Sequence, residues 1–475
     1  MQSPHTPAFW LTSYSLLIDS ALLAFFLASL VCFISGQEKK HQGLLILSGV
    51  LMGMTLLTKY TGVLIFPVVL VWHLLHRQSC SWAGTCMAIA VSGLLFLLWG
   101  VWGLCTYGQM HFIATFSRGF HPAAPVGLIC IALFLMGSLF RRKLSGKILP
   151  ILLSWGCWIP CLILGLRVFA ANASLAAWLE TFYLDKVIAV ASFLGGSSVF
   201  LFVAPYFLWK ESKRAAGEWG VGMLALFLCF VSRYGGFNAL QSAMLAFFIG
   251  SVIAFLIVVG LRVTPVITGK QVFLLSWLGL GLLELVVVMP WTAARYLLLV
   301  LPPVCWLFQD MLESTSRLRL WMFTWGATAI IGAALAYVDF AQAGVIVSMA
   351  DVLQAQRPTF EGLSPRSSHR WYNLADTFDG SQPYVALQGW ENSFPSQAFP
   401  TGSLLLRRVY RKSSWWTLPD TQRYQPLMAW EFNSRVPLRV MDVPASAGFY
   451  ASCWGSLPYA ITRHPLERFV LYIVK

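Results

Sequence analysis

Charged residues are scarce in this chain. Only 11% of its 475 residues are Asp, Glu, Lys or Arg, whereas 58% are hydrophobic. A soluble globular protein carries about 25% charged residues. The scarcity excludes an ordinary soluble protein and indicates a polytopic α-helical membrane protein.

Signature motifs of several enzyme classes are missing as well. The sequence has no Walker loop, dinucleotide fingerprint, zinc-ligand spacing or serine elbow. A nucleotide-driven pump is therefore unsupported. Of the ten cysteines, only Cys453 lies in the C-terminal stretch, so no internal disulfide framework is expected there.

Apolar runs predict about twelve membrane spans, several of them near the roughly 20 residues needed to cross a bilayer. They cover residues 16–35, 43–58, 61–76, 82–106, 122–140, 148–166, 187–209, 217–232, 240–261, 271–289, 297–312 and 320–338. The two short runs beside Lys59 are interpreted as half-buried helices that meet there. After residue 340, charges, prolines and β-rich runs take over. We therefore expect a membrane domain over 1–340 and a small soluble α/β domain over 341–475.

The net charge of +14 reflects topology more than a polyanionic partner. Basic residues gather in alternate connections, such as 39–40, 141–147 and 210–214, and the positive-inside rule makes those connections cytoplasmic. No nucleic acid is implied, and the C-terminal domain is expected on the outer side of the membrane. Residues 1–15 would also lie outside, yet they carry no signal sequence, so we expect that earlier spans are missing.

Asp19 and Lys59 lie at the outer ends of neighbouring apolar runs. An ionisable side chain at the edge of hydrocarbon costs free energy unless it pairs, faces water or binds something. The alternative for Lys59 is that it reaches up to the headgroups. Both residues on one side of the membrane favour a functional site.

The other outer connections contribute further cations, carboxylates and aromatic rings, which suit a phosphorylated lipid headgroup. Tyr60, His111 and Arg118 are candidate substrate-binding residues among them. The alternative is an ordinary interfacial belt of Tyr, Trp and Arg. Glu284, inside the run 271–289, is interpreted as a structural partner of Arg295 or another inward group, with proton or ion binding as the alternative.

Three segments together resemble a known family. They are Ser13 to Asp19, then Gly49, Gly53 and Leu56–Tyr60 with Pro67, and finally Ala294–Pro303. Their order and spacing are similar to the bacterial relatives of protein O-mannosyltransferases and aminoarabinose transferases (glycosyltransferase families 39 and 83). These are multispan enzymes of the GT-C fold that use a polyprenyl-phosphate-linked sugar. The resemblance covers about residues 8 to 340.

The resemblance implies roles for four residues. Asp19 matches a catalytic carboxylate that often binds metal, so a divalent cation is the candidate cofactor. Lys59 is expected to hold the donor phosphate, with Arg295 and Tyr296 beside the same cavity. The family's principal acidic residue, its presumed base, lies in a loop that precedes residue 1, so the base is unassigned.

The sequence thus predicts a glycosyltransferase that moves a sugar from a polyprenyl phosphate to a lipid, glycan or protein acceptor at the outer face of the membrane. Two alternatives stay open: a transporter or lipid-handling protein that uses Glu284, and an inactive truncated remnant of the transferase. In the C-terminal domain, we expect acceptor recognition, strands over 383–387, 403–410, 438–441 and 469–474, and helices over 350–355 and near 369–377.

Overall fold

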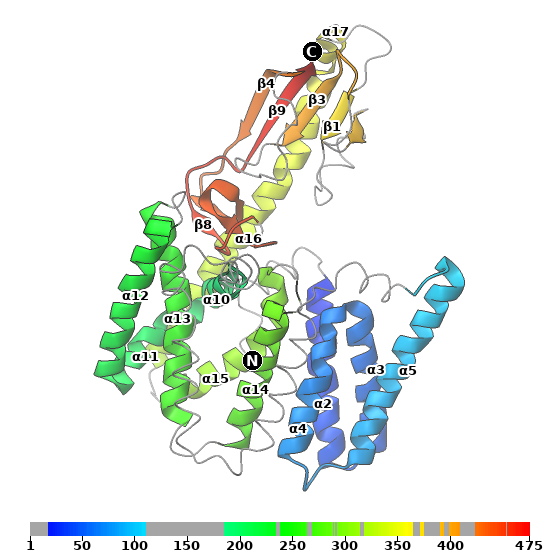
Figure 1. The fold of residues 1–475 in the computed structure, drawn as a ribbon, viewed down its shortest axis with the longest axis vertical. Coiled ribbons are helices and arrows are strands. Elements are labelled where there is room, and N and C mark those ends of the chain that lie inside the picture. Colours follow the sequence, from blue (N-terminus) through cyan, green and yellow to red (C-terminus); the bar gives the residue numbers. More distant parts are fainter. Residues whose placement is uncertain are drawn as a thin grey trace, which may run out of the picture.

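The structure is a computed structural model in which a helical body is joined by one long helix to a small β-sheet (Figure 1). It describes residues 18–110, 185–233, 238–263, 268–287, 289, 292–313, 318–363, 371–374, 390–393, 399–408, 423–452 and 454–475. The predicted spans 122–140 and 148–166 and the predicted strand 383–387 lie outside the described residues.

The first part of the body consists of α2 (Ile18–Glu38), α3 (Gln42–Thr58), η2 (Tyr60–Leu64), α4 (Ile65–Leu75) and α5 (Trp82–Tyr107). Helix α2 packs on α3, and α3 packs on α5. Local chemistry sets the limits of these helices. The His41 side chain accepts a hydrogen bond from the Leu44 amide at the start of α3, and Gly108, with φ +70°, ends α5.

Helix α3 stops at Lys59, whose backbone is extended at φ −164° and ψ 141°. The short 3-10 helix η2 follows at once and turns the chain back against the end of α3. A Cβ on Gly62 would lie 2.7 Å from the carbonyl oxygen of Thr55, so this close approach requires glycine. The predicted meeting of two short helices beside Lys59 is confirmed.

The second part of the body begins with a bent pair of helices. It consists of α10 (Asp185–Ser197), η5 (Val199–Val203), α11 (Ala204–Glu211), α12 (Lys213–Arg233), α13 (Ala239–Val263), α14 (Gly269–Val287), η6 (Ala294–Leu299) and α15 (Leu301–Glu313). The chain bends by 87° between Ser197 and Val199. Helix α13 packs against α10, α11 and α12.

Aromatic packing joins the two parts of the body around η6. The Phe26 ring of α2 stacks on the Trp277 ring of α14 with centroids 5.4 Å apart. The Trp277 Nε1–H donates to the Leu299 carbonyl oxygen over 2.9 Å. Because Trp277 is fully buried, this hydrogen bond fixes the end of η6 against α14.

The chain is a multi-pass membrane protein. By length and composition, six described helices are long and apolar enough to cross a membrane, or up to seven if the bent pair is one span. This count falls short of the predicted twelve for two reasons. Two predicted spans lie outside the described residues, and the predicted runs 43–58, 61–76 and 297–312 form helices that are shorter than a bilayer crossing.

Helix α16 (Leu318–Ala355) rises from the body and runs beside the sheet, where α17 (Arg357–Leu363) follows it (Figure 1). The predicted domain boundary at residue 340 falls inside α16. The apolar residues Val345, Met349 and Leu353 repeat every four positions and pack with Phe360 and strand residues of the sheet in one core.

The sheet has the order β2-β1-β3-β9-β4. Its strands are β1 (Trp371–Leu374), β2 (Glu391–Ser393), β3 (Leu404–Arg408), β4 (Tyr424–Phe432) and β9 (Glu467–Val474). Strand β1 is parallel to β2 and β3, whereas β9 is antiparallel to β3 and β4. The predicted strands 403–410 and 469–474 coincide with β3 and β9. The helix predicted near 369–377 is wrong over β1, where pairing on both sides imposes the extended conformation.

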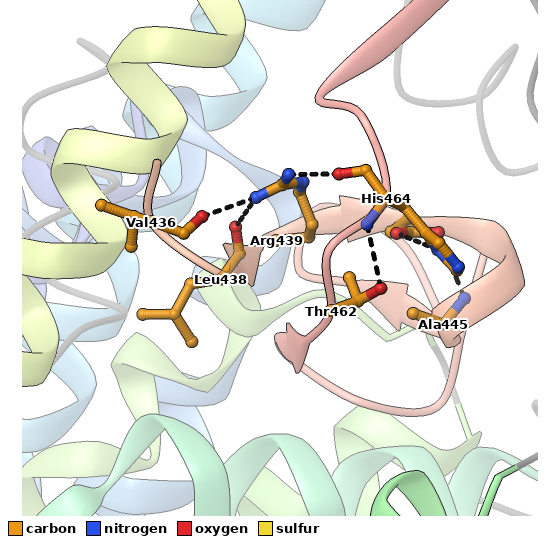
Figure 2. Close-up of polar contacts among 7 residues, drawn as sticks. Val436, Leu438, Arg439, Ala445, Thr462 and His464 are labelled. Carbon is orange, nitrogen blue, oxygen red and sulfur yellow. Dashed lines mark hydrogen bonds and ion pairs between the residues drawn. The ribbon is translucent and has the colours of Figure 1, made fainter. Parts of the chain in front are cut away.

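Two small two-stranded sheets lie between the main sheet and the body (Figure 1). They pair β5 (Leu438–Arg439) with β8 (Ala460–Ile461) and β6 (Met441–Asp442) with β7 (Ala447–Gly448), and η8 (Val443–Ala445) joins β6 to β7. Figure 2 shows the Arg439 guanidinium donating to the carbonyl oxygens of Val436, Leu438 and His464. Arg439 is 1% exposed, so these bonds join β5 from within to the chain that follows β8.

Candidate functional site

Two chain breaks and the first turn of α2 meet at one place in the helical body. Asp19 stands in the first turn of α2, Lys59 follows the last residue of α3, and Arg295 and Tyr296 occupy the first turn of η6. Breaks of this kind free polar groups from helical hydrogen bonding, which suits them to hold a ligand at membrane depth.

Asp19 and Lys59 form a buried ion pair. The Lys59 Nζ donates to Asp19 Oδ1 over 2.5 Å. The Asp19 side chain is 3% exposed and that of Lys59 is 19% exposed. The carboxylate is thus enclosed, while the ammonium keeps a path to solvent or ligand. The carboxylate orients the ammonium and offsets part of its desolvation.

Tyr296 places an aromatic face between two cations. The Lys59 Nζ lies 4.1 Å from the centroid of the Tyr296 ring. The Arg295 Cζ lies 5.3 Å from the same centroid. Both distances fall within the range of cation–π attraction. The ring therefore holds two like charges near each other where they would otherwise repel.

Glu284 of α14 belongs to the same electrostatic cluster. Its charge and that of Arg295 both act on Lys59. Glu284 is 7% exposed. Its Oε1 has no hydrogen-bond partner among the described residues, and the same holds for the buried Nε of Arg295. No ion pair joins Glu284 to Arg295 within that part of the chain, and pairing with another inward group stays a prediction. The two orphaned polar atoms mark a cluster whose hydrogen bonding is incomplete.

The remaining predicted residues divide into two groups. The Tyr60 ring packs against α5, edge-on to Phe96 and tilted to Trp99, each with a centroid separation of 6.4 Å. His111 and Arg118 lie outside the described residues. The structure therefore brings Asp19, Lys59, Arg295 and Tyr296 together as one cluster, and Tyr60 adjoins it through the backbone.

Lys186 supports the loop that leads to this cluster. Its Nζ donates to the Met289 carbonyl oxygen over 2.8 Å, and the residue is 8% exposed. This bond connects α10 to the segment between α14 and η6. Nothing in the sequence connects Lys186 to the chain before Arg295, because this contact depends on how α10 packs.

A metal ion at Asp19 lacks ligands among the described residues. In the ranges that the structure describes, no three His, Cys, Asp or Glu side chains gather to hold a metal. Asp19 is already engaged by the Lys59 ammonium. A divalent cation needs several oxygen ligands, so the described donor set does not fit one.

Comparison with protein families gives one match to the N-terminal part. Residues 6–115 match the family model described as dolichyl-phosphate-mannose-protein mannosyltransferase. The match is consistent with a GT-C mannosyltransferase-like protein, as the sequence resemblance predicted, and it supports a membrane-embedded glycosyltransferase. Comparison with curated proteins and with solved structures gives no match.

The matched segment contains Asp19 and Lys59, whereas Arg295, Tyr296 and Glu284 lie beyond it. The cluster thus joins two residues of the matched region to three from the later helices. Its chemistry suits an anion, because an ammonium and a guanidinium both lie against one aromatic ring. Phosphate is the anion that such a pair binds well.

Proposed function

We propose that this chain is a membrane glycosyltransferase that binds a polyprenyl-phosphate-linked sugar and transfers the sugar to a lipid, glycan or protein acceptor. The observation that carries the proposal is the Lys59–Tyr296–Arg295 cluster, in which two cations converge beside a buried carboxylate. The family match over residues 6–115 supports the reaction class.

The charge of the phosphate explains what the cluster does in the reaction. The donor is a phosphodiester with one negative charge. Transfer breaks the bond between the anomeric carbon and a phosphate oxygen, which keeps the electron pair, and forms a bond from that carbon to the acceptor oxygen. The acceptor hydroxyl loses its proton to water or a carboxylate. The phosphate gains negative charge, so Lys59 and Arg295 bind the transition state more tightly than the donor.

Asp19 has a supporting role in this proposal. It accepts a hydrogen bond from the Lys59 ammonium and is enclosed by protein, so it holds that ammonium in place beside the phosphate. Lys59, Arg295 and Tyr296 contact the donor, and Tyr60, His111 and Arg118 stay candidates for contacts with the rest of the substrate.

We further propose that the reaction takes place at the outer face of a bacterial inner membrane, with the sheet on the same side. The distribution of basic residues supports this orientation. Protease added to the outside of intact cells should cut near the sheet and release a compact fragment. Cleavage only after the inner face is exposed would contradict the orientation.

Lys59→Ala tests the donor site. Full-length protein in lipid nanodiscs should bind a labelled polyprenyl-phosphate mannose, and the variant should bind it about 10- to 100-fold more weakly, since a charge-assisted hydrogen bond is worth about 1.5–3 kcal/mol. Transfer to acceptors in a membrane extract should fall by at least as much.

Lys270→Ala is the matched control. Lys270 also forms an ion pair with an aspartate, Asp310, at 2.9 Å, but its side chain is 62% exposed. It lies at the start of α14, away from Tyr296. We expect donor binding by this variant to equal that of the wild type. Equal binding by Lys59→Ala and the wild type would refute the donor site.

A transporter is the second candidate, because the bent pair α10 and α11 interrupts a possible span and Glu284 is a buried carboxylate. Flux of labelled polyprenyl-phosphate sugar across proteoliposomes separates the candidates. Flux without transfer would favour the transporter.

A further inference from the structure

A turn of the C-terminal region is hydrogen-bonded to the segment that precedes Arg295. The Ser452 amide donates to the Thr292 carbonyl oxygen over 2.7 Å, and the Thr292 amide donates to Ser452 Oγ over 3.0 Å. The Ala294 amide donates to the Phe449 carbonyl oxygen over 2.9 Å. Residues 448–452, named here the 448–452 turn, are thus joined to residues 292–294 by three hydrogen bonds.

Residues 292–294 need such partners. Thr292, Ala293 and Ala294 are each 0% exposed. Ala293 is extended, with φ −135° and ψ 150°, so the segment lies outside any helix. A buried amide without a partner costs about 1–3 kcal/mol. The 448–452 turn supplies acceptors to the amides of Thr292 and Ala294 and thereby sets the backbone from which the next two residues, Arg295 and Tyr296, project.

The turn is itself rigid. Its Gly448 amide donates to the Leu457 carbonyl oxygen over 2.8 Å, and the Leu457 amide donates to the Ser446 carbonyl oxygen over 2.9 Å. A Cβ on Gly455 would lie 2.0 Å from that same Ser446 oxygen, so no other residue fits there.

In the strand that precedes the turn, the Asp442 carboxylate accepts a hydrogen bond from the Ala445 amide over 3.1 Å and forms an ion pair with His464 Nδ1 over 2.8 Å. Figure 2 shows these contacts beside the buried Arg439. The residues that make the three hydrogen bonds to residues 292–294 are therefore themselves held in place by hydrogen bonds.

We propose that Ser452 is a positioning residue for the donor site: through Thr292 it fixes the direction of Arg295 and Tyr296, so the C-terminal region completes a site built in the helical body. The identity of the ligand rests on the proposed function, whereas the grip on residues 292–294 stands on the hydrogen bonds alone.

The test compares Ser452→Ala with Ser452→Thr, which keeps the hydroxyl. Ser434→Ala is the matched control, because Ser434 Oγ also accepts a backbone amide, that of Val436, in the same region. Two quantities are measured on the full chain in nanodiscs: hydrogen–deuterium exchange of the amides of residues 292–299, and binding of a polyprenyl phosphate without sugar.

We expect Ser452→Ala to speed exchange of residues 292–299 and to weaken polyprenyl-phosphate binding about 3- to 10-fold, the loss of roughly one hydrogen bond. Ser452→Thr and Ser434→Ala should match the wild type in both measurements. Unchanged exchange in Ser452→Ala would overturn the proposal, as would faster exchange with unchanged binding. Equal weakening by Ser434→Ala would also overturn it, since the effect would then be general loosening.

Failure of the proposed function gives a different pattern. Wild-type protein would then bind no polyprenyl phosphate, while Ser452→Ala would still speed exchange of residues 292–299. That pattern would refute the donor site but would still support the ordering of residues 292–294 by the 448–452 turn.

Discussion

Two buried ion pairs, Lys59–Asp19 in the helical body and Arg408–Glu467 in the sheet, differ in how well their neighbours satisfy them. Both oxygens of Glu467 accept hydrogen bonds, Oε2 from Arg408 Nε over 2.7 Å and Oε1 from Gln342 Nε2 over 2.7 Å. Beside Lys59, the buried Oε1 of Glu284 has no hydrogen-bond partner among the described residues.

The difference separates a structural pair from a site. In the Arg408–Glu467 pair both carboxylate oxygens accept hydrogen bonds, so the pair holds α16, β3 and β9 together, although the buried Oε1 of the neighbouring Gln342 has no partner among the described residues. The Lys59 cluster instead contains two polar atoms without a partner among the described residues, Glu284 Oε1 and Arg295 Nε, and this incomplete hydrogen bonding costs stability. The comparison predicts opposite responses to mutation in the two places.

The largest effect is expected from Glu467→Ala. It leaves the Arg408 guanidinium, 12% exposed, without its buried partner, so the sheet should lose about 3–5 kcal/mol. Thermal unfolding followed by tryptophan fluorescence measures the loss. Glu431→Ala is the control: Glu431 faces Arg468 at 3.5 Å with a side chain 45% exposed, and such a pair is worth about 0–1 kcal/mol. Equal melting temperatures of the two variants would show that the Arg408–Glu467 pair contributes no more to stability than an exposed pair.

An intermediate effect, on binding instead of stability, is expected from Tyr296→Leu. Removing the ring removes the cation–π contacts with Lys59 and Arg295, worth about 0.5–2 kcal/mol. Affinity for a polyprenyl phosphate should fall about 2- to 30-fold, while the melting temperature changes little. Tyr296→Phe keeps the aromatic face and should bind like the wild type. Loss of binding in Tyr296→Phe would assign the role to the hydroxyl instead of the ring.

The smallest effect is expected from Glu284→Gln. A buried carboxylate oxygen without a hydrogen bond contributes no stability that an amide would lose, so the free energy of unfolding should change by less than about 1 kcal/mol. A loss of several kcal/mol, measured as for Glu467→Ala, would show that Glu284 is a structural group like Glu467.

The sequence allowed the break at Lys59 to be predicted, because two apolar runs too short to cross a bilayer flank an ionisable residue. The resemblance also predicted Arg295 and Tyr296 beside the site of Lys59, and in the structure the Lys59 Nζ lies 4.1 Å from the centroid of the Tyr296 ring. Local pattern and motif order were enough for these features, since each depends on a few consecutive residues.

Features that depend on contacts between residues far apart in the sequence could not be predicted from local patterns. Asp339 interrupts the apolar run that precedes it, yet α16 continues to Ala355 because Val345 and Met349 cover the sheet. Glu284 was noticed as an ionisable residue in a span, but its closeness to Lys59 depends on how α14 packs. The contact of Ser452 with Thr292 joins residues 160 positions apart, and no local signal predicts it.

The place of β9 in the sheet has a consequence for the order of assembly. Strands β3 and β4 are not hydrogen-bonded to each other, and each pairs with β9, as in Leu406 with Leu471 and Ala429 with Val470. During synthesis, the ribosome must therefore deliver residues 467–474 before the two halves of the sheet can join. Pairing over such long loops is slow. The helical body can therefore insert into the membrane before the five-stranded sheet is complete.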